Sequence, residues 1–320
     1  MIDIGINYLT ELEDNQNLYD NIYKFLIENK YINTIKFPGK YCDYENLDKF
    51  ISFAKQINTK IDLHGIPGMF PCMSSKKLLE KIDWELLENR FSNNNLITRI
   101  STHIGIENKD RLVNYKDIEI ENIWKENYNI LNRKMENIVK NKIQIGLENI
   151  PGGFDFDEKT LIPEYVSQNW QKADFGVFDI SHGKLAAKQL NISFNEYLEK
   201  LEFKEKVKIV HVSGIIDNTN KYSHKPDKHV MINIEEIKDI INVIKTFKNI
   251  DLVVSEYAFN TKYSTQKEII IESITLFTIV KTLNYEYAKN ILEILENKLN
   301  DDISNLSDIL KDEVFKNINN

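Results

Sequence analysis

The chain has 320 residues, of which 42% are hydrophobic and 28% are charged, and its formal net charge at pH 7 is -8. This composition is typical of a folded globular protein and excludes a disordered or fibrous chain. The acidic balance disfavours duplex nucleic acid as a partner, because proteins that grip a phosphate backbone usually carry a basic surface.

The sequence contains neither a membrane-spanning run nor a secretion signal. No apolar segment approaches the roughly 18 residues that cross a bilayer, and the first residues lack the basic and apolar regions of a signal peptide. The two cysteines, Cys42 and Cys72, are too few for a disulfide framework, which favours a reducing compartment. We therefore predict a cytoplasmic protein that makes no membrane contact.

Short β-branched or apolar runs alternate with longer segments of helical periodicity, which is the pattern of βα units on a parallel sheet. The predicted strands are Asp3–Tyr8, Thr34–Phe37, Lys60–His64, Leu96–His103, Ile143–Glu148, Phe175–Asp179, Val207–His211 and Leu252–Glu256. The clearest helical segments are Leu47–Ile57, Ile118–Val139, Ile234–Phe247 and the stretch after Lys267. Eight successive βα units close into a barrel, whereas an open doubly wound sheet usually stops at about five or six strands. The predicted fold class is therefore α/β, a (β/α)8 TIM barrel.

Three amphipathic segments follow the eighth strand: Gln266–Asn284, Glu286–Leu299 and Ile303–Phe315. The first completes the last βα unit. The other two are predicted to form a helical extension that covers the barrel or contacts a partner. We therefore predict one barrel domain over residues 1–283 and a C-terminal helical extension over residues 284–320.

Five of the six histidines, together with four carboxylates, lie at or just beyond the C-terminal ends of these strands. They are His64, His103, Glu148, Asp179, His182, His211, Asp227, His229 and Glu256. The βα loops of a barrel converge at that rim, where active sites are built. Imidazoles and carboxylates together are ligands for zinc, iron or manganese rather than for magnesium or calcium alone. The set exceeds the needs of one ion and predicts two or three, each with room for water or substrate.

Each residue also has a simpler interpretation. A single loop histidine is more often solvated or hydrogen-bonded than a metal ligand, and Asp179 is placed to cap the next helix. Separate structural roles, however, give no reason for five histidines to gather at one face, so the metal interpretation is favoured. Outside the set, His224 is interpreted as a surface residue and Cys72 as an ordinary thiol near the barrel mouth.

The ordered motifs resemble the xylose isomerase-like barrel superfamily, which includes endonuclease IV and the multinuclear non-heme iron-dependent oxidative enzymes. The resemblance covers about residues 1–260 and rests on LEN at 147–149, DxxH at 179–182 and DxH at 227–229. It implies His64, His103 and bridging Glu148 on one ion; Asp179, His211, Glu256 and Glu148 on a second; and His182, Asp227 and His229 on a third.

Within the superfamily, HVSG at 211–214, DISH at 179–182 and the pair His64-Gly65 are most similar to the oxidative enzymes. Glu256-Tyr257-Ala258 departs from them, because many members have Glu-x-Asp there. The resemblance implies two or three iron ions that bind a cysteine thiolate of a ribosomally made precursor peptide and use dioxygen. It also implies a small partner protein that presents the peptide, and Glu148, Glu256 and Asp179 become the catalytic candidates.

Three alternatives stay open. A zinc-dependent endonuclease at abasic DNA would need side chains that enter the duplex, and the loops after strands one and two offer only Lys36, Lys40 and Tyr41. A metal-dependent sugar isomerase or epimerase would use Glu148 and Glu256 as bases on opposite sides of the mouth. A non-enzymatic metal-binding protein ranks last, because sites at a barrel mouth normally keep open coordination positions.

Overall fold

The computed structural model gives the arrangement of most of the chain. It describes residues 2–9, 16–39, 42–70, 72–92, 96–105, 117–138, 143–151, 158–215, 230–257, 265–311 and 315. The candidate residues Asp227 and His229 lie outside these ranges, as do His224, Lys40 and Tyr41.

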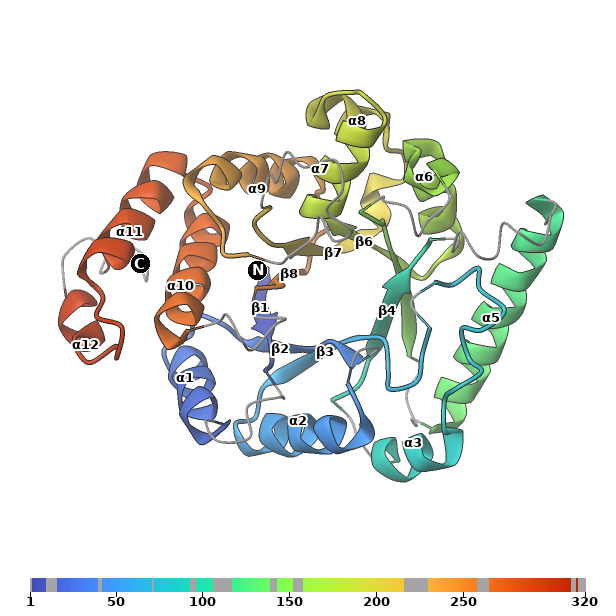
Figure 1. The fold of residues 1–320 in the computed structure, drawn as a ribbon, viewed down its shortest axis with the longest axis horizontal. Helices are drawn as coiled ribbons and strands as arrows, with labels where there is room; N and C mark the ends of the chain where they lie inside the picture. Colours follow the sequence, from blue (N-terminus) through green and yellow to red (C-terminus); the bar gives the residue numbers. More distant parts are fainter. Residues whose placement is uncertain are drawn as a thin grey trace.

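Eight parallel strands form a closed barrel in which each strand pairs with the next and β8 pairs with β1 (Figure 1). The strands are β1 Asp3–Asn7, β2 Thr34–Phe37, β3 Lys60–His64, β4 Arg99–His103, β5 Gln144–Glu148, β6 Phe175–Asp179, β7 Val207–Val212 and β8 Leu252–Ser255. The predicted (β/α)8 barrel is confirmed. The bounds of β2, β3 and β6 agree with the prediction, whereas β4 begins at Arg99 rather than at Leu96.

The strands are short runs of residues that are buried on both faces. In β2 and β6 every residue is buried, as expected for parallel strands enclosed between a barrel interior and a surrounding layer of helices. The register then decides which side chains meet at the mouth. It pairs His103 with Glu148 across β4 and β5, and Asp179 with His211 across β6 and β7.

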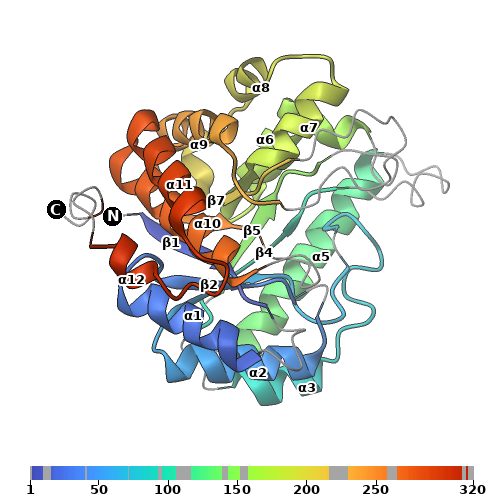
Figure 2. The same cartoon turned by 60° about the vertical axis from the view of Figure 1, so that its left-hand side comes forward.

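Helices surround the barrel, and α1, α2 and α3 follow one another along one side of it (Figure 2). The helices are α1 Gln16–Glu28, α2 Tyr44–Gln56, α3 Trp84–Phe91, α5 Asp117–Ile138, α6 Pro163–Lys172, α7 Ile180–Gln189, α8 Phe194–Lys200, α9 Ile234–Thr246, α10 Gln266–Thr282, α11 Tyr285–Lys298 and α12 Leu306–Ile309. Asn233 and Thr265 begin α9 and α10 with capping boxes, which satisfy backbone N–H groups at both helix starts. None of the described helices is both long and apolar enough to cross a membrane.

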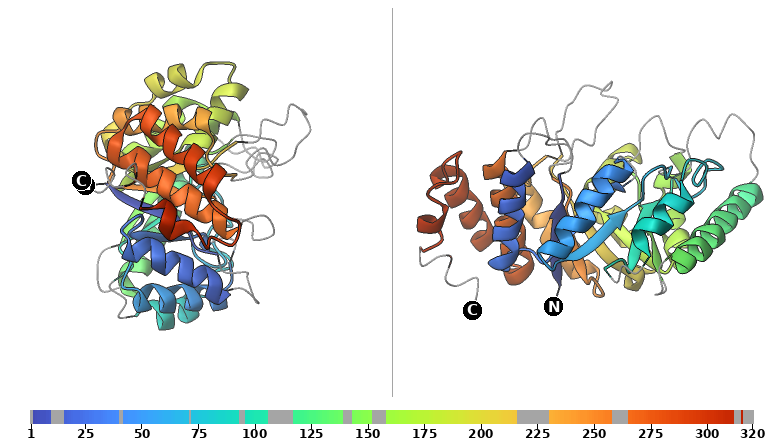
Figure 3. Two further views of the ribbon diagram at one scale, coloured as in Figure 1. Left: turned by 90° about the vertical axis from the view of Figure 1, so that its left-hand side faces the viewer. Right: turned by 90° about the horizontal axis from the view of Figure 1, so that it is seen from below.

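The last two helices pack on the outside of the barrel. Helix α11 contacts α10 and α9, and it lies farther from the strands than α10 does (Figure 3). Within the part of the predicted helix Ile303–Phe315 that the structure describes, a regular helix covers Leu306–Ile309, and residues 312–314 lie outside the described residues. Ile303 has a φ of 55°, a left-handed conformation that interrupts a right-handed helix. The domain division at residue 283 stays a prediction.

Candidate metal centre

The described candidate residues lie at the C-terminal ends of the strands. His64, His103, Glu148 and Asp179 are the last residues of β3, β4, β5 and β6, His211 is in β7, Glu256 directly follows β8 and His182 lies in the first turn of α7. All seven are buried. Side chains that are distant in the sequence therefore share one end of the barrel.

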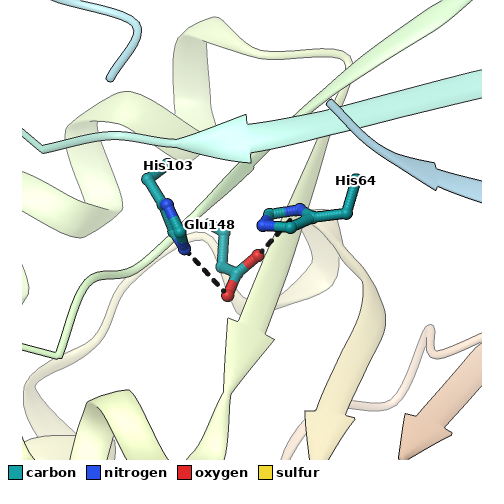
Figure 4. Close-up of side chains that lie close together, drawn as sticks. All are labelled: His64, His103 and Glu148. Atoms are coloured by element: carbon teal, nitrogen blue, oxygen red, sulfur yellow. Dashed lines mark ion pairs between the residues drawn. The ribbon is translucent and has the colours of Figure 1, made fainter. Parts of the chain in front are cut away.

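Glu148 lies at the centre of this group, with four imidazoles around its carboxylate. His103 Nε2 and His182 Nδ1 lie 3.4 Å and 3.3 Å from Oε1. His64 Nδ1 and His211 Nδ1 lie 3.3 Å and 3.1 Å from Oε2. Figure 4 shows His64 and His103 approaching different oxygens of Glu148. Each oxygen of this carboxylate thus faces its own pair of ring nitrogens.

These close contacts are not aligned as hydrogen bonds. Among the described residues, both oxygens of Glu148 and both ring nitrogens of His211 are buried without a hydrogen-bond partner. Leaving such groups unsatisfied costs about 1–3 kcal/mol each, and more when the group is charged. The oxygens of Glu148 and the ring nitrogens of His211 therefore keep lone pairs that bond to nothing else in the described residues, as a metal ion requires, so the residues fit bound ions.

The ionisation states also suit cation binding. Burial opposes the charge on Glu148, but His211, His64 and His103 outweigh it and hold the pKa of this carboxyl well below its usual value. Burial, followed by the positive charge of Lys36, lowers the pKa of His211. An ionised carboxylate and neutral imidazoles are the forms that coordinate metals.

Two groups of side chains could each hold an ion. The first is His64, His103 and Glu148, and the second is Glu148, Asp179, His211 and Glu256; within each group the ligand atoms lie within 4.8 Å of one another. Glu148 belongs to both groups, as the resemblance implies. The third implied set cannot be followed beyond His182, because Asp227 and His229 lie outside the described residues.

Asp179 also has the structural role that the sequence suggested. It is the N-cap of α7, and its Oδ1 accepts a hydrogen bond of 2.6 Å from the backbone N–H of His182. The backbone N–H of Asp179 donates a 2.7 Å hydrogen bond to Asn149 Oδ1. Asn149 Nδ2 in turn donates a 2.9 Å hydrogen bond to the backbone carbonyl oxygen of Asp179. The capping interpretation and the ligand interpretation are therefore compatible, since the cap fixes where the carboxylate lies.

Neighbouring polar groups orient the imidazoles. His64 Nδ1 lies 2.9 Å from Ser101 Oγ, and His182 Nδ1 lies 2.9 Å from the carbonyl oxygen of Asn149. The carbonyl can only accept, so it fixes the proton of His182 on Nδ1 and leaves Nε2 as the basic nitrogen. Such outer contacts are the usual means by which proteins orient ligating histidines.

Sequence reasoning was wrong about Lys36. It named this lysine as a candidate DNA contact, but Lys36, which lies within the predicted strand Thr34–Phe37, is only 1% exposed. Its ammonium forms an ion pair with Glu256 inside the barrel. Alternation along Thr34–Phe37 places Lys36 on the same face as Thr34, and that period was the signal available in the sequence.

Cys72 lies beside the centre, as its predicted position near the mouth suggested. It is completely buried and forms an isolated parallel bridge with His103, whose carbonyl accepts a 3.0 Å hydrogen bond from the next residue, Met73. The segment after β3 is thereby fixed against the end of β4.

No protein-family model and no curated protein matches the sequence. Solved structures do match its fold. A xylose isomerase domain containing protein from Salmonella typhimurium LT2 has a TM-score of 0.55 and 12% identity, over 85% of this chain and 96% of that chain. The 3-keto-D-glucoside 4-epimerase YcjR from E. coli has a TM-score of 0.50 and 9% identity, over 84% of this chain and 98% of that chain. At these identities the likeness shows the fold alone, namely that the chain has the same (β/α)8 barrel fold as these two proteins.

Proposed function

We propose that the protein is a metal-dependent enzyme that binds at least two ions at the barrel mouth, with Glu148 shared between them. His64 and His103 complete the first position, and Asp179, His211 and Glu256 complete the second. The observation that carries this proposal is the carboxylate of Glu148, whose two oxygens each face two ring nitrogens without forming a hydrogen bond. Carboxylates that bridge two ions are a recurrent feature of multinuclear catalytic sites.

We further propose that the ions are iron, with two or three per chain, and that the substrate is a cysteine-containing peptide. Bound iron would supply both thiolate binding and electron transfer to dioxygen, whereas zinc binds thiolates but transfers no electrons. The cysteine of the peptide would be the reductant, and dioxygen would be the oxidant that accepts its electrons. The motif resemblance supports this choice, as does the set of imidazole and carboxylate donors, which suits iron. A ribosomally made peptide presented by a small partner protein is the corresponding proposal for the substrate.

The chain's own residues would then have distinct tasks. Glu148 would keep two ions close together, because it belongs to both groups of candidate ligands. Asp179 and Asn149 fix the end of β6 against the end of β5. Burial of the whole group excludes water from the ligands, which strengthens every electrostatic interaction within the site.

Metal analysis of anaerobically purified protein, with Mössbauer and paramagnetic resonance spectra of the same sample, tests the proposal. We expect two or three irons per chain and a magnetically coupled mixed-valence signal. A peptide pull-down under the same conditions tests the substrate class. Tightly held zinc without oxygen-reactive iron would contradict the oxidative proposal, and cleavage of an abasic-site DNA would then be the next assay.

Isomerisation or epimerisation of a small sugar is the second candidate. The likeness of the fold to a 3-keto-D-glucoside 4-epimerase favours it, and Glu148 and Glu256 are suitably placed carboxylates. One or two ions would polarise a hydroxyl or carbonyl while a carboxylate moves a proton. Incubation of the manganese-loaded protein with 3-keto-glucosides and ketohexoses, followed by NMR, tests this reaction. Epimerised sugar without oxygen consumption would replace the oxidative proposal.

A further inference from the structure

A buried lysine lies against one of the proposed ligands. Lys36, on β2, forms an ion pair with Oε1 of Glu256, although β1 separates the two strands. The same oxygen lies 3.1 Å from His211 Nδ1. The backbone of Glu256 is held as well, because Asn7 Nδ2 donates a 2.8 Å hydrogen bond to its carbonyl oxygen. Lys36 therefore contacts a fixed carboxylate of the second ion position.

The charge of Lys36 acts on that position through a dry interior. Lys36 is 1% exposed and Glu256 is 4% exposed, so water screens their surroundings poorly. Asp62, next to Lys36 in the β2–β3 register, has Arg99 Nε 3.5 Å from its Oδ1, but Arg99 also pairs with Asp251 at 2.9 Å.

We propose that Lys36 lowers the affinity of the second ion position, so that the two positions at Glu148 bind metal unequally. The inference rests on the proposed function, because it assumes that both positions bind ions. Lys36 and an ion at the second position attract the same carboxylate and repel each other. The first position takes its own ligands from β3 and β4, where His64 and His103 end their strands.

The positive charge of Lys36 also determines which ligands the metal-loaded site binds. The carboxylates of Glu148, Asp179 and Glu256 do not neutralise two divalent ions, and Lys36 adds a further positive charge. The second ion is therefore bound best together with an anion, such as a thiolate or hydroxide, that takes an open coordination position. A tight first ion and a weaker, anion-assisted second ion follow from this arrangement.

Titration of the metal-free protein with Co²⁺ alone tests the inference, using calorimetry and the visible absorption of the bound ion. The wild type is expected to show two separate binding steps. In Lys36→Met the second step should tighten by about tenfold or more, because removing a unit charge close to a divalent ion has a large effect in a buried site. The first step should change much less than the second, because Lys36 pairs with Glu256, which is a ligand of the second position only.

Lys60→Met is the matched control. Lys60 is also a lysine on a barrel strand with a carboxylate partner, since its Nζ lies 2.6 Å from Asp3 Oδ2. It begins β3, at the opposite end of the strand from His64, and its side chain is 66% exposed. Both Co²⁺ steps of this variant should match the wild type. Lys36→Gln, which removes the charge and keeps a polar side chain, gives the same test if Lys36→Met does not fold.

The results that would contradict this inference differ from those that would contradict the proposed function. A second step that is unchanged or weaker in a folded Lys36 variant, with two steps in the wild type, overturns the inference and leaves the proposed function standing. A wild-type protein that binds no Co²⁺, or a single ion, contradicts the proposed function itself. An equal tightening in Lys60→Met would assign the effect to overall charge and would also overturn the inference.

Discussion

The interior of the barrel has two unlike halves. Along β6, β7 and β8 the inward side chains form a separate apolar cluster, which consists of Phe175, Val177, Ile209, Leu252 and Val254. Along β1 to β4 the buried residues include Asn7, Lys36, Asp62 and Ser101. The two halves have the same strand geometry. Apart from the candidate ligands Asp179, His211 and Glu256 at the strand ends, however, the first half is filled with hydrocarbon, and the second contains charged and polar groups.

This difference indicates that the apolar half contributes mainly to the stability of the fold, whereas the polar half contributes mainly to the proposed function. The apolar half is stabilised by the burial of its hydrocarbon side chains. The ring of Phe175 packs so closely against Gly146 of β5 that a Cβ added at Gly146 would clash with it. The polar half lowers the stability of the fold, because Lys36, Asp62 and the imidazoles at the barrel mouth lose their hydration when they are buried. A fold selected only for stability would replace these residues, so we attribute them to the metal centre.

The largest expected effect tests the apolar half. Phe175→Ala should lower the free energy of unfolding by about 3–5 kcal/mol, because a fully buried aromatic ring is lost and a cavity remains. Urea denaturation of metal-free protein measures it. Leu18→Ala, at a side chain that is 41% exposed, should cost far less. Equal losses in the two variants would show that the apolar cluster is not a principal source of stability.

The next effect tests the polar half. Glu148→Gln should weaken ion binding at both positions by about 100-fold or more, because the shared negative charge is lost. Competition with a chromophoric chelator measures the two constants. Glu164→Gln, on the exposed surface of α6, is the control and should bind ions as the wild type does. Loss of a single ion in Glu148→Gln would show that the carboxylate is not shared.

The last effect appears only as the pH is changed and concerns Glu272, which contacts β8 through Ser255. Burial raises the pKa of this carboxyl to about 8, and its oxygens contact Ser255 Oγ at 2.6 Å and the N–H of Ile232 at 2.8 Å. A raised pKa means that the folded state holds a proton which the unfolded state releases. The stabilisation is therefore complete below the ordinary pKa of 4.5 and is lost as the pH rises through about 8.

Glu272→Gln mimics the protonated carboxyl, because its amide can donate to Ser255 and accept from Ile232. We expect this variant to lose the decline in stability between about pH 5 and pH 8, a decline that cannot exceed about 1.4 kcal/mol per pH unit for one proton. Thermal unfolding across this range measures it. Glu293→Gln, in an exposed ion pair on α11, should keep the wild-type decline. An unchanged decline in Glu272→Gln would assign the pH dependence to other groups.

Much of the fold could be predicted because each strand is a short apolar run followed by a helical period. The ends of β3, β4, β5 and β6 fell at the expected residues, and this placed His64, His103, Glu148 and Asp179 together at the mouth. The start of α12 at Leu306 rather than at Ile303 was not predictable, since a left-handed residue at Ile303 has no signal in a helical hydrophobic pattern.

Lys36 was missed for a different reason. A lysine in a sequence pattern normally marks an exposed position, and only the closed barrel makes the inward face of β2 a buried one. Its partner Glu256 is far away in the sequence and meets it only because β8 pairs with β1. Long-range contacts of this kind depend on closure of the barrel and are invisible to local periodicity.

The central claim is that Glu148 joins two ions, and paramagnetic resonance of protein loaded with two Mn²⁺ per chain tests it most directly. Two ions that share a carboxylate should give an exchange-coupled spectrum, and Glu148→Gln should not. The spectrum of isolated Mn²⁺ from wild-type protein that holds both ions would contradict the account.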